Sequence, residues 1–76
     1  MNIEEFIQKL EVELEDIESG TLKSETKFRT IPGWSSMHAL IIIAFADTEY
    51  NITVTGEDLR SCITVNDLFE IVISRI

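Results

Sequence analysis

The stretch SSMHALIIIAFADTEY, residues 35–50, decides the fold. Ser35 and Ser36 are both good N-caps, because a serine hydroxyl can accept a hydrogen bond from the free N–H groups of a helix start. The apolar run at residues 41–43 would also suit a buried strand, but the pattern continues for about fourteen residues, over 37–50, and this length favours a helix. Apolar residues cover most of the circumference, so we expect this helix to be the central and most buried one.

The segment before it predicts another helix and a long connection. Apolar residues recur at helical spacing from Ile3 onward, and Ser19-Gly20 provides a stop, because glycine tolerates a left-handed cap. The predicted buried face consists of Ile3, Phe6, Ile7, Leu10, Leu14 and Ile17. The predicted solvated face holds Glu4, Glu5, Glu11, Glu15 and Glu18. Residues 21–35 then form a loop, interrupted by the breaker Ile31-Pro32-Gly33. The side chains expected to pin this loop to the core are Leu22, Phe28, Ile31 and Trp34.

Two capping-box patterns follow the central helix. Thr55-Gly56-Glu57-Asp58 predicts a short helix over residues 57–61, and Thr64-Val65-Asn66-Asp67 predicts the start of a last helix. The residues of the last helix expected to face inward are Val65, Leu68, Phe69, Val72 and Ile76. The predicted fold class is therefore all-α. It is a four-helix bundle of three main helices and a short third helix, with a long loop between helices one and two.

The length and the net charge of the chain limit the number of domains and the kinds of partner that we expect. The chain has 76 residues and a mass of 8.7 kDa, which predicts a single domain over residues 1–76. Apolar residues make up 45% and charged residues 26%, a composition typical of globular proteins. The formal net charge is -8. This argues against nucleic acid or an anionic membrane as partner, since both attract basic surfaces, and favours protein partners that carry basic patches.

The cysteine and histidine content limits the chemistry further. Cys62 is the one cysteine and His38 the one histidine, which excludes an internal disulfide and a zinc knuckle. We expect Cys62 to be a buried core residue and the compartment to be the reducing cytoplasm. The apolar run at residues 37–46 is much shorter than the roughly 20 residues that span a bilayer. No membrane span is expected.

Few side chains could carry chemistry. We expect His38 to lie on the solvated or partner-facing side of its helix, with no third group to orient it as a catalytic base. Trp34 is interpreted as an anchor of the loop, or otherwise as an exposed recognition side chain. A serine at a helix N-terminus commonly serves as a cap. The free N–H groups of the helix start and the positive end of the helix dipole also favour a phosphate-bearing group attached to such a serine.

From Phe28 onward the chain resembles an acyl carrier protein. Members of that family have a long loop, Asp-Ser-Leu at the start of helix two, an aromatic residue fourteen positions after the serine, and Thr-Val-x-Asp-Leu at the start of helix four. This sequence has Trp34-Ser35-Ser36-Met37, then Tyr50 fourteen residues after Ser36, and later Thr64-Val65-Asn66-Asp67-Leu68. Gly56-Glu57-Asp58-Leu59-Arg60 is similar to a Gly-(Asp/Glu)-Asp-Leu-Arg stretch in small bacterial members with Trp-Asp-Ser-Leu at the site.

The resemblance implies that Ser36 Oγ is the attachment point for 4′-phosphopantetheine, moved from coenzyme A by a phosphopantetheinyl transferase. The thiol of this arm would carry acyl groups as thioesters for fatty-acid, polyketide or related biosynthesis, so the chain itself would not be an enzyme. The residues expected to contact partner enzymes with basic patches are Trp34, Met37, His38 and Ile41. The expected slot for the acyl chain is lined by Met37, Leu40, Ile41, Ala44, Phe45, Ile63 and Phe69.

Departures from the family pattern leave alternatives open. Ser35 stands where the family has Asp, so a negative charge is missing and Ser35 is a second candidate for attachment, although the spacing to Tyr50 favours Ser36. His38 and Ile41 stand in a part of helix two that usually presents acids. One alternative is an unmodified, carrier-like interaction module in which both serines only cap. Another is a small hydrolase that uses Ser36 and His38. We expect a monomer, with a weak dimer of the unmodified form left open.

Overall fold

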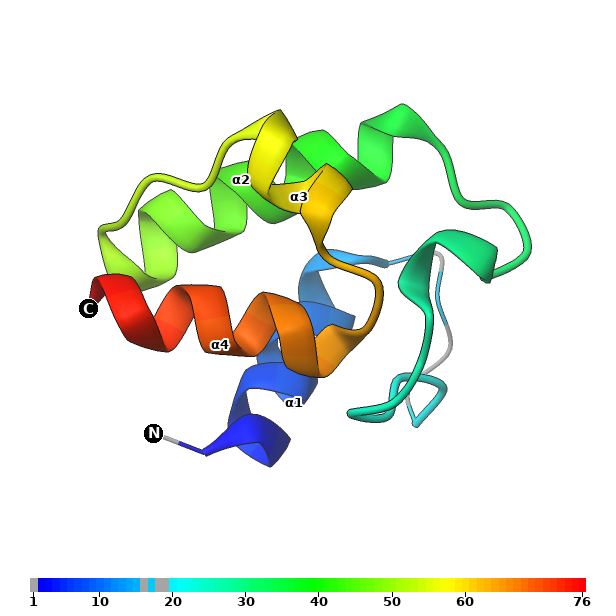
Figure 1. Cartoon of the computed structure of the whole chain (residues 1–76). Coiled ribbons are helices and arrows are strands. Elements are labelled where there is room, and N and C mark those ends of the chain that lie inside the picture. Colours follow the sequence, from blue (N-terminus) through cyan, green and yellow to red (C-terminus); the bar gives the residue numbers. More distant parts are fainter. Residues whose placement is uncertain (1, 16, 18–19) are drawn as a thin grey trace.

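The computed structural model describes residues 2–15, 17 and 20–76. These residues form four α-helices and one turn of 3-10 helix, and no strand occurs among them. The elements are α1 (Ile3–Glu13), η1 (Phe28–Thr30), α2 (Ser36–Tyr50), α3 (Gly56–Ser61) and α4 (Val65–Arg75). The predicted all-α, four-helix bundle is confirmed. Figure 1 shows the loop between α1 and α2 at the end of the bundle away from the C-terminus. No helix in this described part is both long enough and apolar enough to cross a membrane.

The last three helices begin where their predicted caps stand. Ser35 is the N-cap of α2. Thr55 Oγ1 accepts the N–H of Asp58 at 3.1 Å, and Asp58 Oδ2 accepts the N–H of Thr55 at 2.8 Å. The same reciprocal pair joins Thr64 and Asp67 at the start of α4. Each pair satisfies two backbone N–H groups that a helix start leaves without partners, so these boundaries follow from local sequence.

The prediction for the end of the first helix was wrong. Helix α1 ends at Glu13, and the N–H of Leu14 closes its last turn on the carbonyl of Leu10 at 2.9 Å. Of the predicted stop, Ser19 lies outside the described residues, and Gly20 lies in the loop with a φ of +88°. Leu14 and Ile17 are nevertheless buried. The apolar pattern therefore continues into the turn after the helix, which is why periodicity alone overestimated its length.

A cluster of aromatic rings ties three helices together. The ring of Phe6 lies 5.9 Å from that of Phe45 and 5.3 Å from that of Phe69, centroid to centroid. The described buried apolar residues around it are Leu10, Leu14, Ile17, Leu22, Phe28, Ile42, Ala46, Ile52, Val54, Leu59, Cys62, Val65, Leu68 and Val72. The expected burial of Cys62 is confirmed. Ile76 was expected to face inward but is 67% exposed, since it lies beyond the last turn of α4.

Helix α2 is buried on one side only, so the prediction that it is the most buried helix was wrong. Its buried residues are His38, Ile42, Phe45 and Ala46, which share one helical face. Met37 and Leu40 are each 66% exposed. No other element among the described residues covers this outer face. The expected acyl slot is wrong for the same reason, because Met37 and Leu40, together with Ile63 at 56% exposure, lie outside the core.

The loop between α1 and α2 is fastened to the bundle by apolar and polar contacts. Leu22 and Phe28 are buried, and Ile31 and Trp34 are partly buried against the core, so the predicted pins are confirmed. The N–H groups of Val65 and Asn66 donate to loop carbonyls of Thr26 and Ser24 at 3.0 and 2.9 Å. The loop therefore also satisfies free N–H groups in the first turn of α4.

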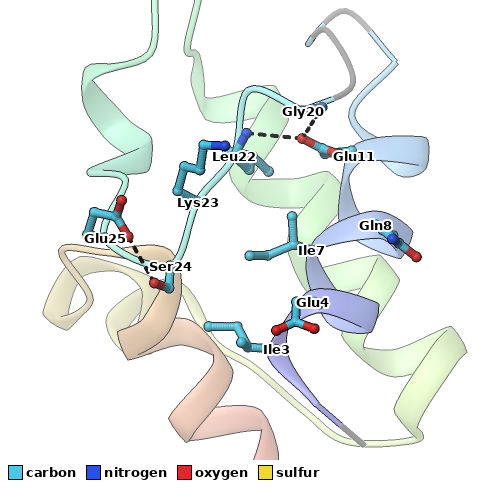
Figure 2. Close-up of a pocket in the computed structure, with 10 residues that line it drawn as sticks. All are labelled: Ile3, Glu4, Ile7, Gln8, Glu11, Gly20, Leu22, Lys23, Ser24 and Glu25. Carbon is cyan, nitrogen blue, oxygen red and sulfur yellow. Dashed lines mark hydrogen bonds between the residues drawn. The ribbon is translucent and has the colours of Figure 1, made fainter.

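Glu11 fastens the start of the loop to α1. Its Oε2 accepts the N–H of Gly20 at 2.9 Å and the N–H of Leu22 at 3.0 Å, as Figure 2 shows. Glu11 is buried, so its predicted place on the solvated face was wrong. A carboxylate can be buried in this way because two backbone donors replace its water.

Replacing Glu11 by alanine is expected to destabilise the fold by about 2 kcal/mol, because two partly buried N–H groups lose a charged acceptor. Glu11→Gln keeps one acceptor oxygen and should lose less. Urea unfolding followed by circular dichroism measures both. Glu13→Ala removes an exposed carboxylate two residues away and serves as the control. Equal losses for Glu11→Ala and Glu13→Ala would contradict a structural role for the Glu11 carboxylate.

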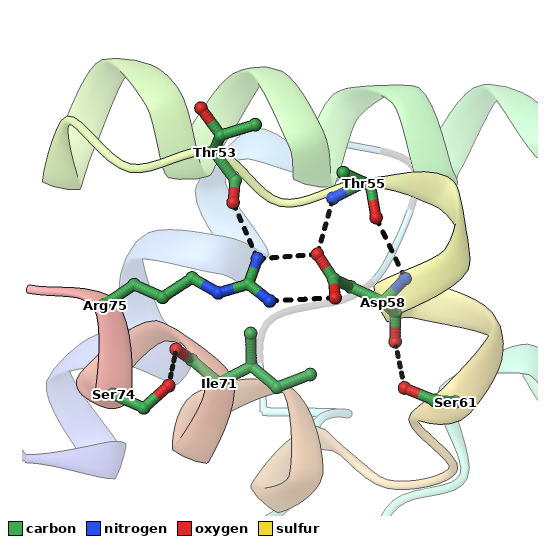
Figure 3. Close-up of polar contacts among 7 residues, drawn as sticks. All are labelled: Thr53, Thr55, Asp58, Ser61, Ile71, Ser74 and Arg75. Carbon is green, nitrogen blue, oxygen red and sulfur yellow. Dashed lines mark hydrogen bonds and ion pairs between the residues drawn. The ribbon is translucent and has the colours of Figure 1, made fainter.

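A bidentate ion pair joins the C-terminal helix α4 to α3. Arg75 donates to both carboxylate oxygens of Asp58, at 2.6 and 2.9 Å, and to the carbonyl of Thr53 at 2.7 Å (Figure 3). The guanidinium of Arg75, followed by the N–H of Thr55, holds the pKa of Asp58 well below its ordinary value. One carboxylate thus both caps α3 and holds the end of α4.

The Arg75–Asp58 ion pair is expected to make the free energy of unfolding depend on pH. Because the pKa of Asp58 is depressed in the folded state, its contribution is complete above the ordinary carboxyl pKa, near 4, and is lost as the pH falls below that value. Arg75→Met should therefore flatten the decline in the urea midpoint between about pH 5 and pH 2. Arg60→Met is the control. It removes an exposed guanidinium from α3, the helix that Asp58 caps, and should leave the pH dependence of the urea midpoint unchanged. Parallel curves for Arg75→Met and the parent protein would refute the assignment.

Candidate functional site

A tight turn sets the approach to α2. The N–H of Trp34 donates to the carbonyl of Ile31 at 3.0 Å, and Gly33 between them has a φ of +85°. A proline at the second position and a glycine with positive φ at the third are typical of a type II turn. The predicted breaker Ile31-Pro32-Gly33 therefore reverses the chain and brings Trp34 back over the loop.

Three rings pack together between this turn and the first turn of α2: Trp34 stacks on His38, and Phe28 is tilted against Trp34. The centroid of Trp34 lies 5.4 Å from that of Phe28 and 4.9 Å from that of His38, with the indole and imidazole planes only 25° apart. Trp34 is partly buried. It acts as a loop anchor whose two ring neighbours belong to η1 and α2.

His38 is buried, with 6% of its surface exposed, so its predicted solvated position was wrong. Its Nδ1 accepts the backbone N–H of Ser35 at 3.1 Å and lies 3.1 Å from Ser35 Oγ. It takes the place that Glu or Gln has in a capping box, three residues after the N-cap. A backbone N–H can only donate, so Nδ1 carries the lone pair and the proton of the neutral ring is on Nε2. This contact directs Nδ1 at Ser35.

Ser36 is the first residue of α2 and is exposed, as is Ser35. Beside Ser36 is a pocket of about 250 Å³ between the loop, α2 and α3. Its lining residues are Phe28, Arg29, Trp34, Ser36, Ala39, Gly56, Leu59 and Arg60. A hydroxyl accessible from solvent thus lies at the edge of a mainly apolar hollow and at the N-terminus of a fifteen-residue helix.

Arg29 fixes the far wall of this pocket. Its guanidinium donates to the carbonyls of Leu59 at 2.8 Å, of Arg60 at 3.3 Å and of Cys62. These carbonyls lie at the C-terminal end of α3, where a helix leaves its acceptors unpaired. The loop and α3 are therefore held together around the pocket. Sequence reasoning missed this role, because nothing local marks a loop arginine as the cap of a helix thirty residues away.

The other polar groups near this region are less suited to chemistry. Burial raises the pKa of the Cys62 thiol, and the charges of Asp67 and Asp58 raise it further, so little of it is thiolate at neutral pH. A wider groove of about 440 Å³ lies between α1 and residues 20–25 (Figure 2). The hydroxyl of Ser24 in that groove donates to Glu25 at 2.9 Å. Its acidic walls and occupied hydroxyl make it a poor place to attach an anion.

The residues predicted to contact partners fall into two groups. Met37 is exposed and Ile41 partly buried on the outer side of α2, where Leu40 adds to the apolar surface. Trp34 and His38 instead stack on each other, away from that side. Comparison of the chain with protein families, with curated proteins and with solved structures found no match.

Proposed function

We propose that this chain is an acyl carrier protein, in which Ser36 Oγ carries a 4′-phosphopantetheine arm and the arm holds acyl groups as thioesters. The observation that carries the proposal is an exposed serine at the first position of a long helix, beside an apolar pocket. The sequence resemblance around Ser36 and Tyr50 supports it. In this function the arm supplies the reactive thiol, and the protein supplies attachment, shelter and delivery.

The position of Ser36 suits a phosphodiester. The first N–H groups of a helix have no acceptors inside it, and the helix dipole places partial positive charge there. A phosphate joined to Ser36 Oγ would lie within reach of these donors. Ser35, the second candidate, is less suitable because its backbone N–H and its hydroxyl both lie against the imidazole of His38.

The pocket beside Ser36 offers shelter for the acyl group. Each buried CH₂ contributes roughly 0.8 kcal/mol, so even a few carbons would favour the pocket over water. Its volume of about 250 Å³ is below the range of about 300–1,000 Å³ usual for sites that enclose a whole ligand. It is therefore suited to a short acyl group or to the first carbons of a longer one.

Partner enzymes would approach the outer side of α2. Met37 and Leu40 offer an exposed apolar contact next to Ser36, and Asp47 and Glu49 near the end of the helix are exposed acids. A net charge of -8 would steer enzymes with basic patches toward the carrier. We infer a phosphopantetheinyl transferase and acyl-loading and acyl-processing enzymes of the cytoplasm as these partners.

Incubation with coenzyme A and a broad-specificity phosphopantetheinyl transferase, followed by intact mass spectrometry, tests the proposal. A gain of one phosphopantetheine arm per chain is the expected result. No gain with several transferases would overturn it and favour the unmodified interaction module, in which the exposed apolar side of α2 only binds other proteins.

A further inference from the structure

The contact between His38 and Ser35 holds the first turn of α2, which presents Ser36. Nδ1 accepts the Ser35 N–H at 3.1 Å, and the ring stacks on Trp34, which closes the turn at Gly33. Ser36 stands between the two capping residues in the chain and lines the same pocket as Trp34. The first turn of α2, which carries Ser36, is therefore held in part by this imidazole.

The acceptor role of His38 exists only in the neutral ring. A proton on Nδ1 would turn the nitrogen into a donor that faces the Ser35 N–H, so the cap would lose its acceptor. It would also place a positive charge in the first turn of a helix, where the dipole disfavours cations, on a ring that is 6% exposed. The face of Trp34 attracts a cation and opposes these effects, but it cannot restore the hydrogen bond to Ser35.

The geometry at Nδ1 sets the consequence of a proton on the ring, and several charged groups belong to the elements near it. Arg29 and Arg60 line the neighbouring pocket. The described acids on the packed elements are Glu4, Glu5, Glu11, Glu13 and Glu15 in and after α1, and Glu57 and Asp58 on α3. Of these, Glu11 already accepts from Gly20 and Leu22 and Asp58 from Arg75. Asp16 and Glu18 lie outside the described residues.

We infer that His38 is a positioning residue for Ser36: the neutral ring holds the helix start in the form that a phosphopantetheinyl transferase can modify, and a proton on Nδ1 would release it. The modification step rests on the proposed function, whereas the release does not. Imidazole is the side chain that ordinarily changes charge near neutral pH, so the pH dependence of modification is the measurement that tests this role.

The test compares the parent protein with His38→Gln, because glutamine in this position accepts the N-cap N–H in a capping box but does not titrate. Both proteins are modified in one tube and distinguished by intact mass, so the pH dependence of the transferase cancels. Their rates should match at pH 8. At pH 5.5 the parent protein should be modified about fivefold more slowly than His38→Gln, the factor that corresponds to one neutral hydrogen bond. A rate ratio that does not change with pH would overturn the inference.

A second measurement separates this inference from the proposed function. Trp34 is the one tryptophan, so its fluorescence reports the stack directly and needs no transferase. The emission should titrate between pH 8 and 5 in the parent protein and stay constant in His38→Gln. If neither protein is modified, the proposed function fails and this titration alone decides: a difference between the two proteins supports His38 as the switch, and identical curves refute it.

Discussion

Ser36→Ala is expected to take up no phosphopantetheine arm at any time of incubation, whereas the parent protein takes up one. The reason is chemical, because alanine lacks the oxygen that must form the phosphodiester. The fold should persist. Ser36 is exposed, and alanine is a good residue inside a helix. Intact mass spectrometry measures uptake, and circular dichroism of the same sample shows that helical content is unchanged.

Ser35→Ala is the matched control for this prediction. It removes the neighbouring hydroxyl but keeps the backbone N–H that donates to His38 Nδ1, so the cap of α2 persists. The arm should therefore still attach. Uptake by Ser36→Ala together with loss in Ser35→Ala would move the attachment point by one residue. Uptake by neither single variant would mean that both hydroxyls are needed, a result that simple attachment at Ser36 does not allow.

The starts of α2, α3 and α4 could be predicted because an N-cap is decided by residues within three positions of one another. Ser35, Thr55 and Thr64 each stand just before a helix and bond to a residue three further on. The same short range explains why the turn at Gly33 was predictable. In each case the partner of the backbone group is visible in the local sequence.

The burial of Glu11 and His38 could not be predicted, because hydrophobic periodicity assigns every charged or polar side chain to the outside. Glu11 is buried since backbone donors of Gly20 and Leu22, from the following loop, come to its carboxylate. His38 lies on the inner face of α2 because it caps the helix and stacks on Trp34. Their positions depend on the path of the loop, and no spacing rule describes that path.

The exposure of the outer side of α2 could not be predicted from the apolar pattern either. Its apolar residues were assigned to a core because burial lowers the free energy of apolar side chains. A chain of 76 residues has too few elements to surround a helix, so Met37 and Leu40 remain at the surface. Large apolar side chains that stay exposed next to one another on a helix are typical of a surface that binds another protein.

The largest loss of stability is expected from Phe6→Ala. The Phe6 side chain is 1% exposed, and its ring lies within about 6 Å of those of Phe45, Phe69 and Tyr50. Removing a buried phenyl ring costs about 3–5 kcal/mol. A domain of this size has only about 4–11 kcal/mol in total. A substantial fraction of the variant should therefore be unfolded at 37 °C, which thermal unfolding by circular dichroism would show.

Val12→Ala is the control for Phe6→Ala, because Val12 lies on the same helix but is 72% exposed. Its effect should stay within about 0.5 kcal/mol, and the higher helix propensity of alanine offsets part of any loss. Phe6→Leu fills part of the space and should fall between the two. The aromatic cluster lies in the core that α1, α2 and α4 share, so Phe6→Ala should also slow loading at Ser36 in proportion to the unfolded fraction. A Phe6→Ala variant as stable as Val12→Ala would mean that the three helices are held together by contacts other than this ring.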